Sequence, residues 1–314
     1  MKLSVVIPCF NEEASLPSTL ERVINAANTA KESMGDYEII LIDDGSTDLT
    51  WKLIKGACLN NPSVRGIRLS RNFGHQVALS AGLQSATGER IFIIDADLQD
   101  PPELLPKMMQ ALDEGADVAY GSRVSRDGEG FFKLVTAFGF YRFINWLSDI
   151  EIPRDTGDFR LVNRKVIDAV NSMPERHRFL RGMFAWVGFK QVPIDYDRAE
   201  RFAGESKYPL KAMLRFAITA ITSFSVRPLR LAMLMAACFA IASFLGILYV
   251  VIGHFLGGTA QGWTSLMVVV LFIASLQFLL LGIIGEYIGR MFTEQKGRPL
   301  FICSENCGSE VIRQ

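Results

Sequence analysis

The chain has 314 residues, a formal net charge of zero at pH 7 and 49% hydrophobic residues. Without an excess of basic residues we expect no nucleic-acid partner, and the length gives room for one large core or two domains. The five cysteines include no CxxC pair and the chain has only three histidines, which predicts reduced thiols, no structural zinc and a cytoplasmic location. The apolar run at 3–7 is too short for a signal peptide, so we expect no secretion signal there.

Strand and helix patterns alternate over the first 120 residues. Strands are predicted at 3–7, 38–42, 64–69, 90–94 and 116–120, and helices at 13–31, 49–59, 76–85 and 103–114. This alternation predicts an α/β domain with a mostly parallel sheet covered on both faces. No GxGxxG follows the first strand and no GxxxxGK occurs, so dinucleotide and P-loop sites are not supported.

Two aspartates, Asp95 and Asp97, follow the predicted strand at 90–94, and a proline-led helix begins shortly after them. In an open α/β sheet the ligand site lies beyond the carboxyl ends of the strands, so these carboxylates are expected to face a site. Two acids together with the oxygens of a bound diphosphate suit Mg²⁺ or Mn²⁺. In an ordinary loop an Asp-x-Asp is more often a solvated turn, but the position between a buried strand and a helix favours metal binding.

Polar turns also follow the first three predicted strands. The turn after the first strand contains Asn11 and Glu12, and the turn after the second contains Asp44. Both are compatible with plain turn and helix-cap chemistry, but a carboxylate at a strand end can also accept an N–H of uracil or guanine, which gives Asp44 a base-reading role. Arg71, after the third strand, either binds phosphate at a helix N-terminus or pairs on the surface.

Three segments in the middle of the chain suggest a membrane surface. Residues 131–147 form a strongly aromatic helical pattern that either packs in the core or lies on the membrane, and its two cations favour the membrane. The segment at 208–226 reads as an interfacial helix. Between them lies a loop that is either solvated or binds a phosphate carried on a lipid. Its cations are Arg198, Arg201 and Lys207.

Two long apolar stretches follow. Residues 231–255 carry no charge apart from a protonated His254, and residues 263–284 carry none. Each exceeds the roughly 20 residues needed to cross a hydrocarbon core, which predicts transmembrane helices at 229–256 and 263–284. The connector between them has no Lys or Arg, whereas cations flank the pair, so both termini are predicted to be cytoplasmic and the connector external.

Several motifs occur together and in order. They are Val6-Ile7-Pro8-Cys9-Phe10-Asn11-Glu12-Glu13, Ile42-Asp43-Asp44-Gly45-Ser46, Ser70-Arg71-Asn72-Phe73-Gly74 and Asp95-Ala96-Asp97-Leu98-Gln99-Asp100-Pro101-Pro102-Glu103. This order resembles the GT-A glycosyltransferases of the dolichyl-phosphate-mannose-synthase type. Three further motifs are Thr156-Gly157-Asp158-Phe159-Arg160-Leu161, Phe179-Leu180-Arg181-Gly182-Met183-Phe184-Ala185-Trp186-Val187-Gly188 and Arg201-Phe202-Ala203-Gly204-Glu205-Ser206-Lys207. With Gly285-Glu286-Tyr287-Ile288-Gly289-Arg290 and Arg298-Pro299-Leu300 they extend the resemblance to the bacterial and phage polyprenyl-phosphate (bactoprenol) glucosyltransferases of O-antigen modification.

The resemblance implies a Rossmann-like GT-A domain that transfers a hexose with inversion, best assigned as glucose from UDP-glucose, onto undecaprenyl phosphate. It implies a divalent metal at Asp97 and Asp95, and it makes Asp158, in a polar turn, the residue nearest the acceptor phosphate in the catalytic-base position. Arg198, Arg201 and Lys207 are assigned to that phosphate. The nucleotide-sugar site would comprise Pro8, Asn11, Glu12, Asp44, Arg71, Asp95, Gln99 and Arg123.

The expected organisation is a cytoplasmic catalytic domain at 1–207, an interfacial helix at 208–228, the two spans, and a cytoplasmic tail at 285–314, in the bacterial inner membrane. A processive polysaccharide synthase is a weaker alternative, because the chain has no Gln-x-x-Arg-Trp and only two predicted spans. A non-catalytic nucleotide-sugar-binding scaffold and another donor sugar are further alternatives. The oligomeric state, including a homo-oligomer, is left open.

Overall fold

The computed structural model describes residues 2–123, 156–197, 227–255 and 262–308. The predicted helix at 131–147, the cationic loop at 198–207 and the interfacial helix at 208–226 lie outside these residues. The described chain divides into an α/β unit, which residues from 298 onward rejoin, and a helical unit. Each unit is described by itself.

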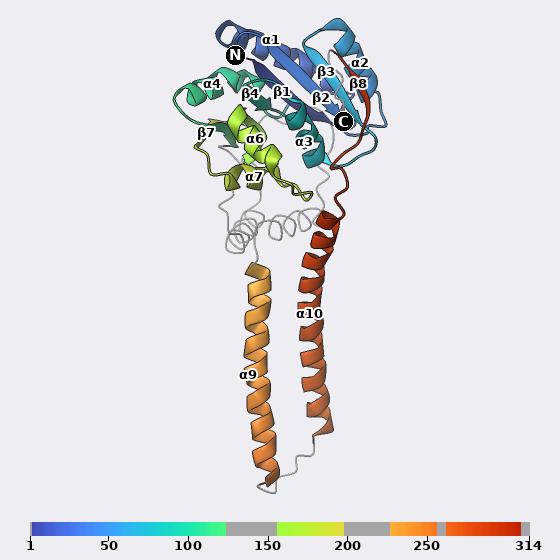
Figure 1. Ribbon diagram of the computed structural model, residues 1–314, viewed down its shortest axis with the longest axis vertical. Helices are drawn as coiled ribbons and strands as arrows, with labels where there is room; N and C mark the ends of the chain where they lie inside the picture. Colours follow the sequence, from blue (N-terminus) through green and yellow to red (C-terminus); the bar gives the residue numbers. More distant parts are fainter. Residues whose placement is uncertain (1, 124–155, 198–226, 256–261, 309–314) are drawn as a thin grey trace. The chain divides into compact units, whose positions relative to one another are not determined.

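The α/β unit is built on an eight-stranded sheet in the order β7-β5-β6-β4-β1-β2-β3-β8 (Figure 1). β1 pairs in parallel with β2 and β4, β2 pairs in parallel with β3, and β5 with β7. β6 is antiparallel to β4 and β5, and β8 is antiparallel to β3. The predicted mostly parallel sheet is thus confirmed. The strands are β1 Leu3–Cys9, β2 Tyr37–Asp43, β3 Val64–Leu69, β4 Arg90–Ile93, β5 Val118–Arg123, β6 Thr156–Asn163, β7 Gln191–Tyr196 and β8 Cys303–Cys307.

Helices cover both faces of the sheet. Alternate strand residues point to opposite faces, and consecutive apolar residues of β1 are buried, so both faces need to be covered. Leu3, Val5 and Ile7 of β1 are buried in one core with residues of α1, α2 and α4. On the other face α3 packs so closely that a Cβ at Gly82 would lie 2.3 Å from Val6. Each fully buried aliphatic side chain contributes about 1.5–3 kcal/mol. The helices are α1 Leu16–Met34, α2 Thr50–Asn60, α3 His75–Ser85, the 3₁₀ turn η1 Pro102–Leu104, α4 Leu105–Asp113, α6 Arg164–Ser172 and α7 Leu180–Trp186.

Strand β6 corrects one prediction. Asp158 was expected in a polar turn, but it lies inside β6, which runs between β4 and β5. β6 pairs with β4 over Arg160–Asn163 and with β5 on either side of an irregularity in register, so tertiary contacts outweigh the weak strand preference of a Gly-Asp dipeptide.

The cysteines correct a second prediction. Reduced thiols were expected throughout, but Cys58 of α2 and Cys307 of β8 form a disulfide. The other three cysteines, Cys9, Cys238 and Cys303, are free. The two bonded residues are 249 positions apart in sequence and meet only because β8 pairs with β3, beside α2.

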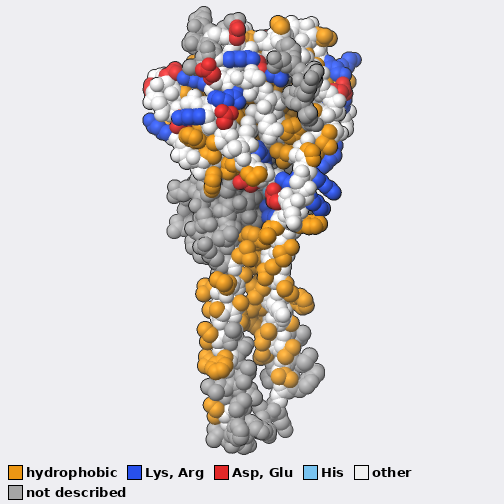
Figure 2. Space-filling view, viewed as in Figure 1, with side chains coloured by type: hydrophobic (Ala, Val, Ile, Leu, Met, Phe, Trp, Pro, Cys, Tyr) orange, Lys and Arg blue, Asp and Glu red, His pale blue; other side chains and the backbone are white. Residues whose placement is uncertain are grey.

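The helical unit contains two long helices, α9 Arg227–Phe255 and α10 Trp263–Gln295, which contact each other. Figure 2 shows apolar side chains along their exposed surface. Phe244 of α9 and Phe278 of α10 are among the exposed large hydrophobic residues. Within the described residues, one segment, Phe272–Gln295, is long and apolar enough to cross a membrane, and Ala232–Gly246 is a shorter apolar helix. The two-span arrangement remains a prediction.

Candidate active site

The site lies where the parallel strands end. Cys9 of β1 pairs with Asp43 of β2, and the backbone N–H of Asp44 donates to the carbonyl of Cys9 at 2.9 Å. On the other side of β1, the N–H of Ile94, just past β4, donates to Val6 at 3.2 Å. The loops after β1, β2 and β4 therefore leave the sheet at one edge, as predicted for an α/β ligand site.

The loops after β1 and β2 hold each other through Asn11. Its N–H donates to the Ser46 hydroxyl at 3.0 Å, and its side-chain oxygen accepts the N–H of Thr47 at 2.9 Å. Asn11 has a positive φ of 54°, a conformation that Asn tolerates better than most residues. The neighbouring N–H of Glu12 donates to the Thr50 hydroxyl at 2.9 Å, so the two loops form one unit.

Asp44 ties this unit to the loop after β3. Its carboxylate is buried, and its two oxygens accept the N–H groups of Phe73 at 2.8 Å and Gly74 at 2.9 Å. Burial raises the pKa of Asp44, and these two hydrogen bonds oppose the rise. A Cβ built on Gly45 would lie 2.4 Å from the backbone carbonyl carbon of Arg71, and the φ of Gly45 is +69°. Both the lack of space and the backbone conformation therefore require glycine at this position. Base reading by Asp44 remains a prediction, and its visible role is to hold the third loop.

Arg71 itself points its guanidinium at an aromatic ring. It is exposed, stacks 4.1 Å from the ring centroid of Phe73 and donates to the carbonyl of Asn72 at 3.1 Å. Its phosphate-binding role stays a prediction.

Asp95 and Asp97 follow β4 in a strained loop. Leu98 between Asp97 and Gln99 has a φ of 62°, which is rare for a bulky residue and often marks a functional loop. The N–H of Gln99 donates to Asp97 at 3.1 Å. The Oδ1 atom of Asp95 is buried and makes no hydrogen bond within the described chain. Desolvation raises the pKa of Asp95 to about 6, with further contributions from nearby acids and an opposing one from His75.

The register of β6 brings Asp158 next to Asp95. Ile93 pairs with Arg160, so Asp158 lies two residues further along the antiparallel strand, toward the position of Asp95. His75, at the start of α3, connects the two carboxylates. Its Nε2 lies 3.1 Å from Asp158 and 3.6 Å from Asp95.

Asp158 is buried and surrounded by donors. The amide of Gln76 donates to its Oδ2 at 3.0 Å, and the Nε of Arg181 in α7 donates to its Oδ1 at 3.1 Å. Burial would raise the pKa of Asp158, but Arg181 and His75 outweigh it and hold the pKa well below its usual range. The His75 side chain is 44% exposed. Desolvation lowers the pKa of His75, yet the attraction of Asp95 and the bond to Asp158 raise it to about 9. At neutral pH the cluster therefore holds an ionised carboxylate and an imidazolium.

His75, Gln76 and Arg181 were not predicted as site residues. His75 is one of only three histidines and directly follows the Ser70–Gly74 motif, and Arg181 lies in a motif used for the resemblance, so weak signals existed. What the sequence does not show is that α3, β6 and α7 meet at one carboxylate.

The remaining predicted residues are only partly placed. Pro8 is buried within β1, and the backbone of Arg123 ends β5 opposite Tyr196 of β7. Arg198, Arg201 and Lys207 lie outside the described residues. Across the part of the chain that is described, no group of three or more His, Cys, Asp or Glu side chains is arranged to hold a metal by itself.

Comparisons with known proteins cover both units. The model of glycosyl transferase family 2 matches residues 4–170, and the GtrB C-terminal hairpin model matches residues 227–291. The uncharacterized glycosyltransferase YkcC of Bacillus subtilis (strain 168) is 44% identical over 314 residues, which cover 100% of this chain and 96% of that protein. The bactoprenol glucosyl transferase of Shigella phage SfII is 37% identical over 307 residues, 98% of each. A crystal structure of S. aureus TarS 1–349 with UDP-GlcNAc has a TM-score of 0.49 and 19% identity, covering 71% of this chain and 66% of that one.

Proposed function

We propose, from the premise that this chain belongs to glycosyl transferase family 2, that it transfers glucose from UDP-glucose to a polyprenyl phosphate, undecaprenyl phosphate in bacteria. As a member of that family it is a glycosyltransferase with a GT-A α/β fold. The observation that carries the acceptor and the sugar is the end-to-end similarity to a phage bactoprenol glucosyl transferase. The matching C-terminal hairpin model supports a membrane-bound enzyme.

The proposed cofactor is Mg²⁺ or Mn²⁺, held by Asp97 and Asp95. The residues fit such an ion, because the Oδ1 atom of Asp95 is buried and has no hydrogen bond, only an ion pair with His75 Nε2 at 3.6 Å, and the loop is rich in carboxylates. Two carboxylates do not supply a full set of ligands, but Mg²⁺ is commonly held by one or two carboxylates together with substrate phosphates. When bound, the ion would offset the charge of the diphosphate as it leaves.

The proposed reaction is a single displacement with inversion. An oxygen of the acceptor phosphate forms a bond to C1 of glucose while the bond from C1 to the UDP oxygen breaks, and the electron pair leaves on UDP. An α-linked donor then gives a β-linked lipid phosphate. The second pKa of a phosphate monoester is about 6, so the nucleophile is already largely ionised at neutral pH.

Asp158 is proposed to orient the acceptor and not to remove a proton. Its carboxylate is ionised and engaged by His75, Gln76 and Arg181, and a carboxylate with so low a pKa is a weak general base. The adjacent imidazolium and guanidinium reduce the repulsion between this carboxylate and an incoming phosphate.

The lipid phosphate is assigned to Arg201 and Lys207, with Arg198 beside them, on sequence grounds alone. The enzyme is placed in the bacterial inner membrane with two spans, and the catalytic unit and both termini are placed in the cytoplasm. The products would supply lipid-linked glucose for O-antigen or other envelope glycans.

Transfer of radiolabelled glucose from UDP-glucose to undecaprenyl phosphate in membranes containing the full chain tests the proposal. Asp97→Ala should lower this transfer at least about a hundredfold, because a cation of this kind contributes several kcal/mol to the transition state. NMR of the anomeric proton should identify a β-linked product.

The matched control is Asp168→Ala, which removes an exposed carboxylate of α6 paired with Arg164. It should transfer glucose at the wild-type rate. Absence of labelled lipid with the wild type contradicts the proposed donor and acceptor, near-normal transfer by Asp97→Ala contradicts the metal assignment, and an α-linked product contradicts single displacement.

A further inference from the structure

The last strand, β8, connects the end of the chain to the proposed donor site. It lies antiparallel to β3, and just before it the carbonyl of Ile302 accepts the N–H of Ser70 at 2.8 Å. The Ser304 hydroxyl donates to the carbonyl of Arg68 at 3.2 Å. β8 thus contacts the final residues of β3 at the point where the Ser70–Gly74 loop begins.

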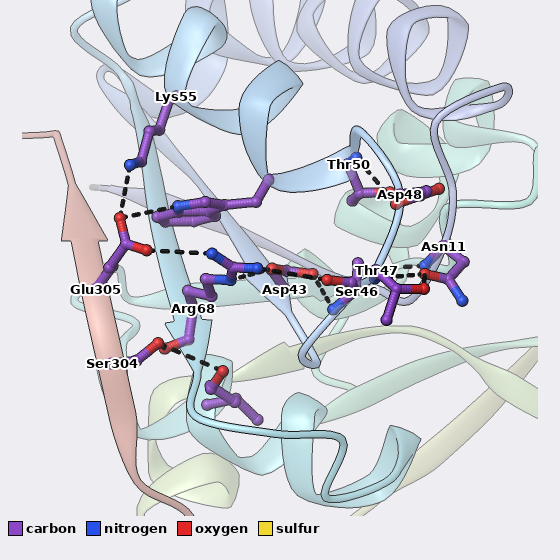
Figure 3. Close-up of polar contacts among 12 residues, drawn as sticks. Asn11, Asp43, Ser46, Thr47, Asp48, Thr50, Lys55, Arg68, Ser304 and Glu305 are labelled. Atoms are coloured by element: carbon purple, nitrogen blue, oxygen red, sulfur yellow. Dashed lines mark hydrogen bonds and ion pairs between the residues drawn. The ribbon is translucent and has the colours of Figure 1, made fainter.

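Arg68 of β3 is the side chain that joins β8 to the β2 loop (Figure 3). Its Nη1 donates to the carboxylate of Glu305 at 3.1 Å, and its Nε lies 3.1 Å from the Oδ2 of Asp43 in an ion pair. The Asp43 carboxylate is fully buried, and a buried charge is costly unless it is paired. Arg68 therefore compensates a charge that the β2 loop requires.

Asp43 uses its other oxygen to shape that loop. Its Oδ1 accepts the N–H of Ser46 at 3.0 Å, and the Ser46 hydroxyl accepts the N–H of Asn11 at 3.0 Å, as Figure 3 shows. A continuous chain of contacts thus runs from Glu305 through Arg68 and Asp43 to Ser46 and Asn11. These last residues belong to the two loops assigned to the nucleotide sugar.

Glu305 is held by cations on both sides. Its Oε2 accepts from the indole of Trp51 at 3.1 Å and lies 2.6 Å from Lys55, while its Oε1 accepts from Arg68. The hydrogen bonds from Lys55, Trp51 and Arg68 lower the pKa of Glu305 to about 2. The carboxylate is charged at all physiological pH values and keeps the guanidinium oriented between Glu305 and Asp43.

We propose that Arg68 and Glu305 are positioning residues for the donor nucleotide, through which the C-terminal strand fixes the two loops that bind it. This inference rests on the proposed function, because it takes those loops as the donor site. It assigns no contact with the acceptor, so donor affinity should change and acceptor affinity should not.

The test compares Arg68→Gln with Lys52→Gln in the full-length protein. Lys52 is the matched control, because it is an exposed cation of the same helix as Trp51 and takes no part in the hydrogen bonds that hold Glu305. Arg68→Gln should raise the KM for UDP-glucose about tenfold, because a small displacement of binding groups weakens binding, while kcat and the KM for the lipid stay within about twofold. Lys52→Gln should leave all three constants within about twofold.

Glu305→Gln is the milder second variant, because it keeps the Arg68–Asp43 pair and an oxygen that accepts from Arg68. It should raise the donor KM by a smaller factor in the same direction, even if Arg68→Gln does not fold. An unchanged donor KM in Glu305→Gln and Arg68→Gln, or an equal increase in Lys52→Gln, overturns the inference.

Calorimetric titration of the full chain with uridine diphosphate separates this inference from the proposed function. No binding by the wild type contradicts the proposed donor. Equal affinity of the wild type and Arg68→Gln contradicts the positioning role alone, and a selective loss in Arg68→Gln supports it.

Discussion

Glu38 is a buried carboxylate in β2 that the fold stabilises without help from a ligand. Its Oε1 accepts from the hydroxyls of Ser4 and Thr87, both at 2.6 Å, and its Oε2 pairs with Arg65 at 2.8 Å. Burial would raise the pKa of Glu38, but these bonds outweigh it and lower the pKa from 4.5 to about 2. Hydrogen bonds to the charged form therefore dominate at this residue.

We expect Glu38→Gln to lower the free energy of unfolding by about 3 kcal/mol at pH 7, the equivalent of the shift in pKa. Because the folded pKa of Glu38 is depressed, its contribution is fully present above the unfolded pKa of 4.5 and is lost as the pH falls toward 2. Denaturant unfolding of the α/β unit within the full chain, followed by circular dichroism from pH 7 to 3, measures the difference.

The control is Glu21→Gln on the exposed face of α1, which should change the free energy of unfolding little at any pH. A Glu38→Gln deficit that is as large at pH 3 as at pH 7 would contradict the assignment of the effect to the carboxylate charge.

At the scale of elements, the first five strands could be predicted from the sequence, whereas β6, β7 and β8 could not. The bounds of β3, at 64–69, were predicted correctly, because Val64, Ile67 and Leu69 are apolar and turn residues flank the segment. β6 contains Gly157 and Asp158, and β8 reads Cys-Ser-Glu-Asn-Cys, so neither shows the apolar pattern of a buried strand. Both form because neighbouring strands offer unpaired backbone groups.

The candidate site likewise contains residues that could be predicted from the sequence and residues that could not. The acids Asp95 and Asp97 were predicted because one strand and the residues after it carry the whole signal. The contacts of His75 and Arg181 with Asp158 depend on three segments that meet only in the folded chain. Local patterns predict which loops form a site, whereas the register of β6 decides which side chains lie next to each other there.

The bond between Cys58 and Cys307 fastens β8 to α2 and makes a prediction at the element scale. Alkylation of the purified, denatured protein without reductant should modify three cysteines, namely Cys9, Cys238 and Cys303, and reductant should raise the number to five. Since a cross-link that closes a long loop restricts the unfolded chain, reductant should also lower the stability of the α/β unit, by about 2–4 kcal/mol. Mass spectrometry and thermal unfolding provide the two measurements.

Cys58→Ser is the matched control, because it removes the cross-link but retains the hydrogen bonds of β8 with β3. Its melting temperature should be the same with and without reductant. Five modifiable cysteines in the unreduced wild type would show that the pair is a dithiol, as the sequence alone had predicted.

At the scale of the whole molecule, the return of the chain to β8 constrains the membrane topology. β3 precedes the helical unit and β8 follows it, yet the two strands pair in one sheet. Strands of one sheet must be on the same side of a membrane, so the chain between them crosses it an even number of times. α9 and α10 lie in that interval, which supports the proposed two spans over a single one.

This pairing also shows how the anchor should be tested. Truncation after residue 226 would remove β8 together with the hairpin, and with it the contact of Glu305 with Arg68, so it cannot isolate the role of the anchor.

Reporter fusions leave the sheet intact. Alkaline phosphatase inserted in the connector at 257–262 should be active outside the cytoplasmic membrane, because this connector has no Lys or Arg and cations flank the pair of helices. Green fluorescent protein fused after residue 314 should fluoresce in the cytoplasm. Reporters that place the connector and the C-terminus on the same side of the membrane would contradict two spans. If the reporters lie on opposite sides and the fusion proteins still transfer glucose, both α9 and α10 must cross the membrane.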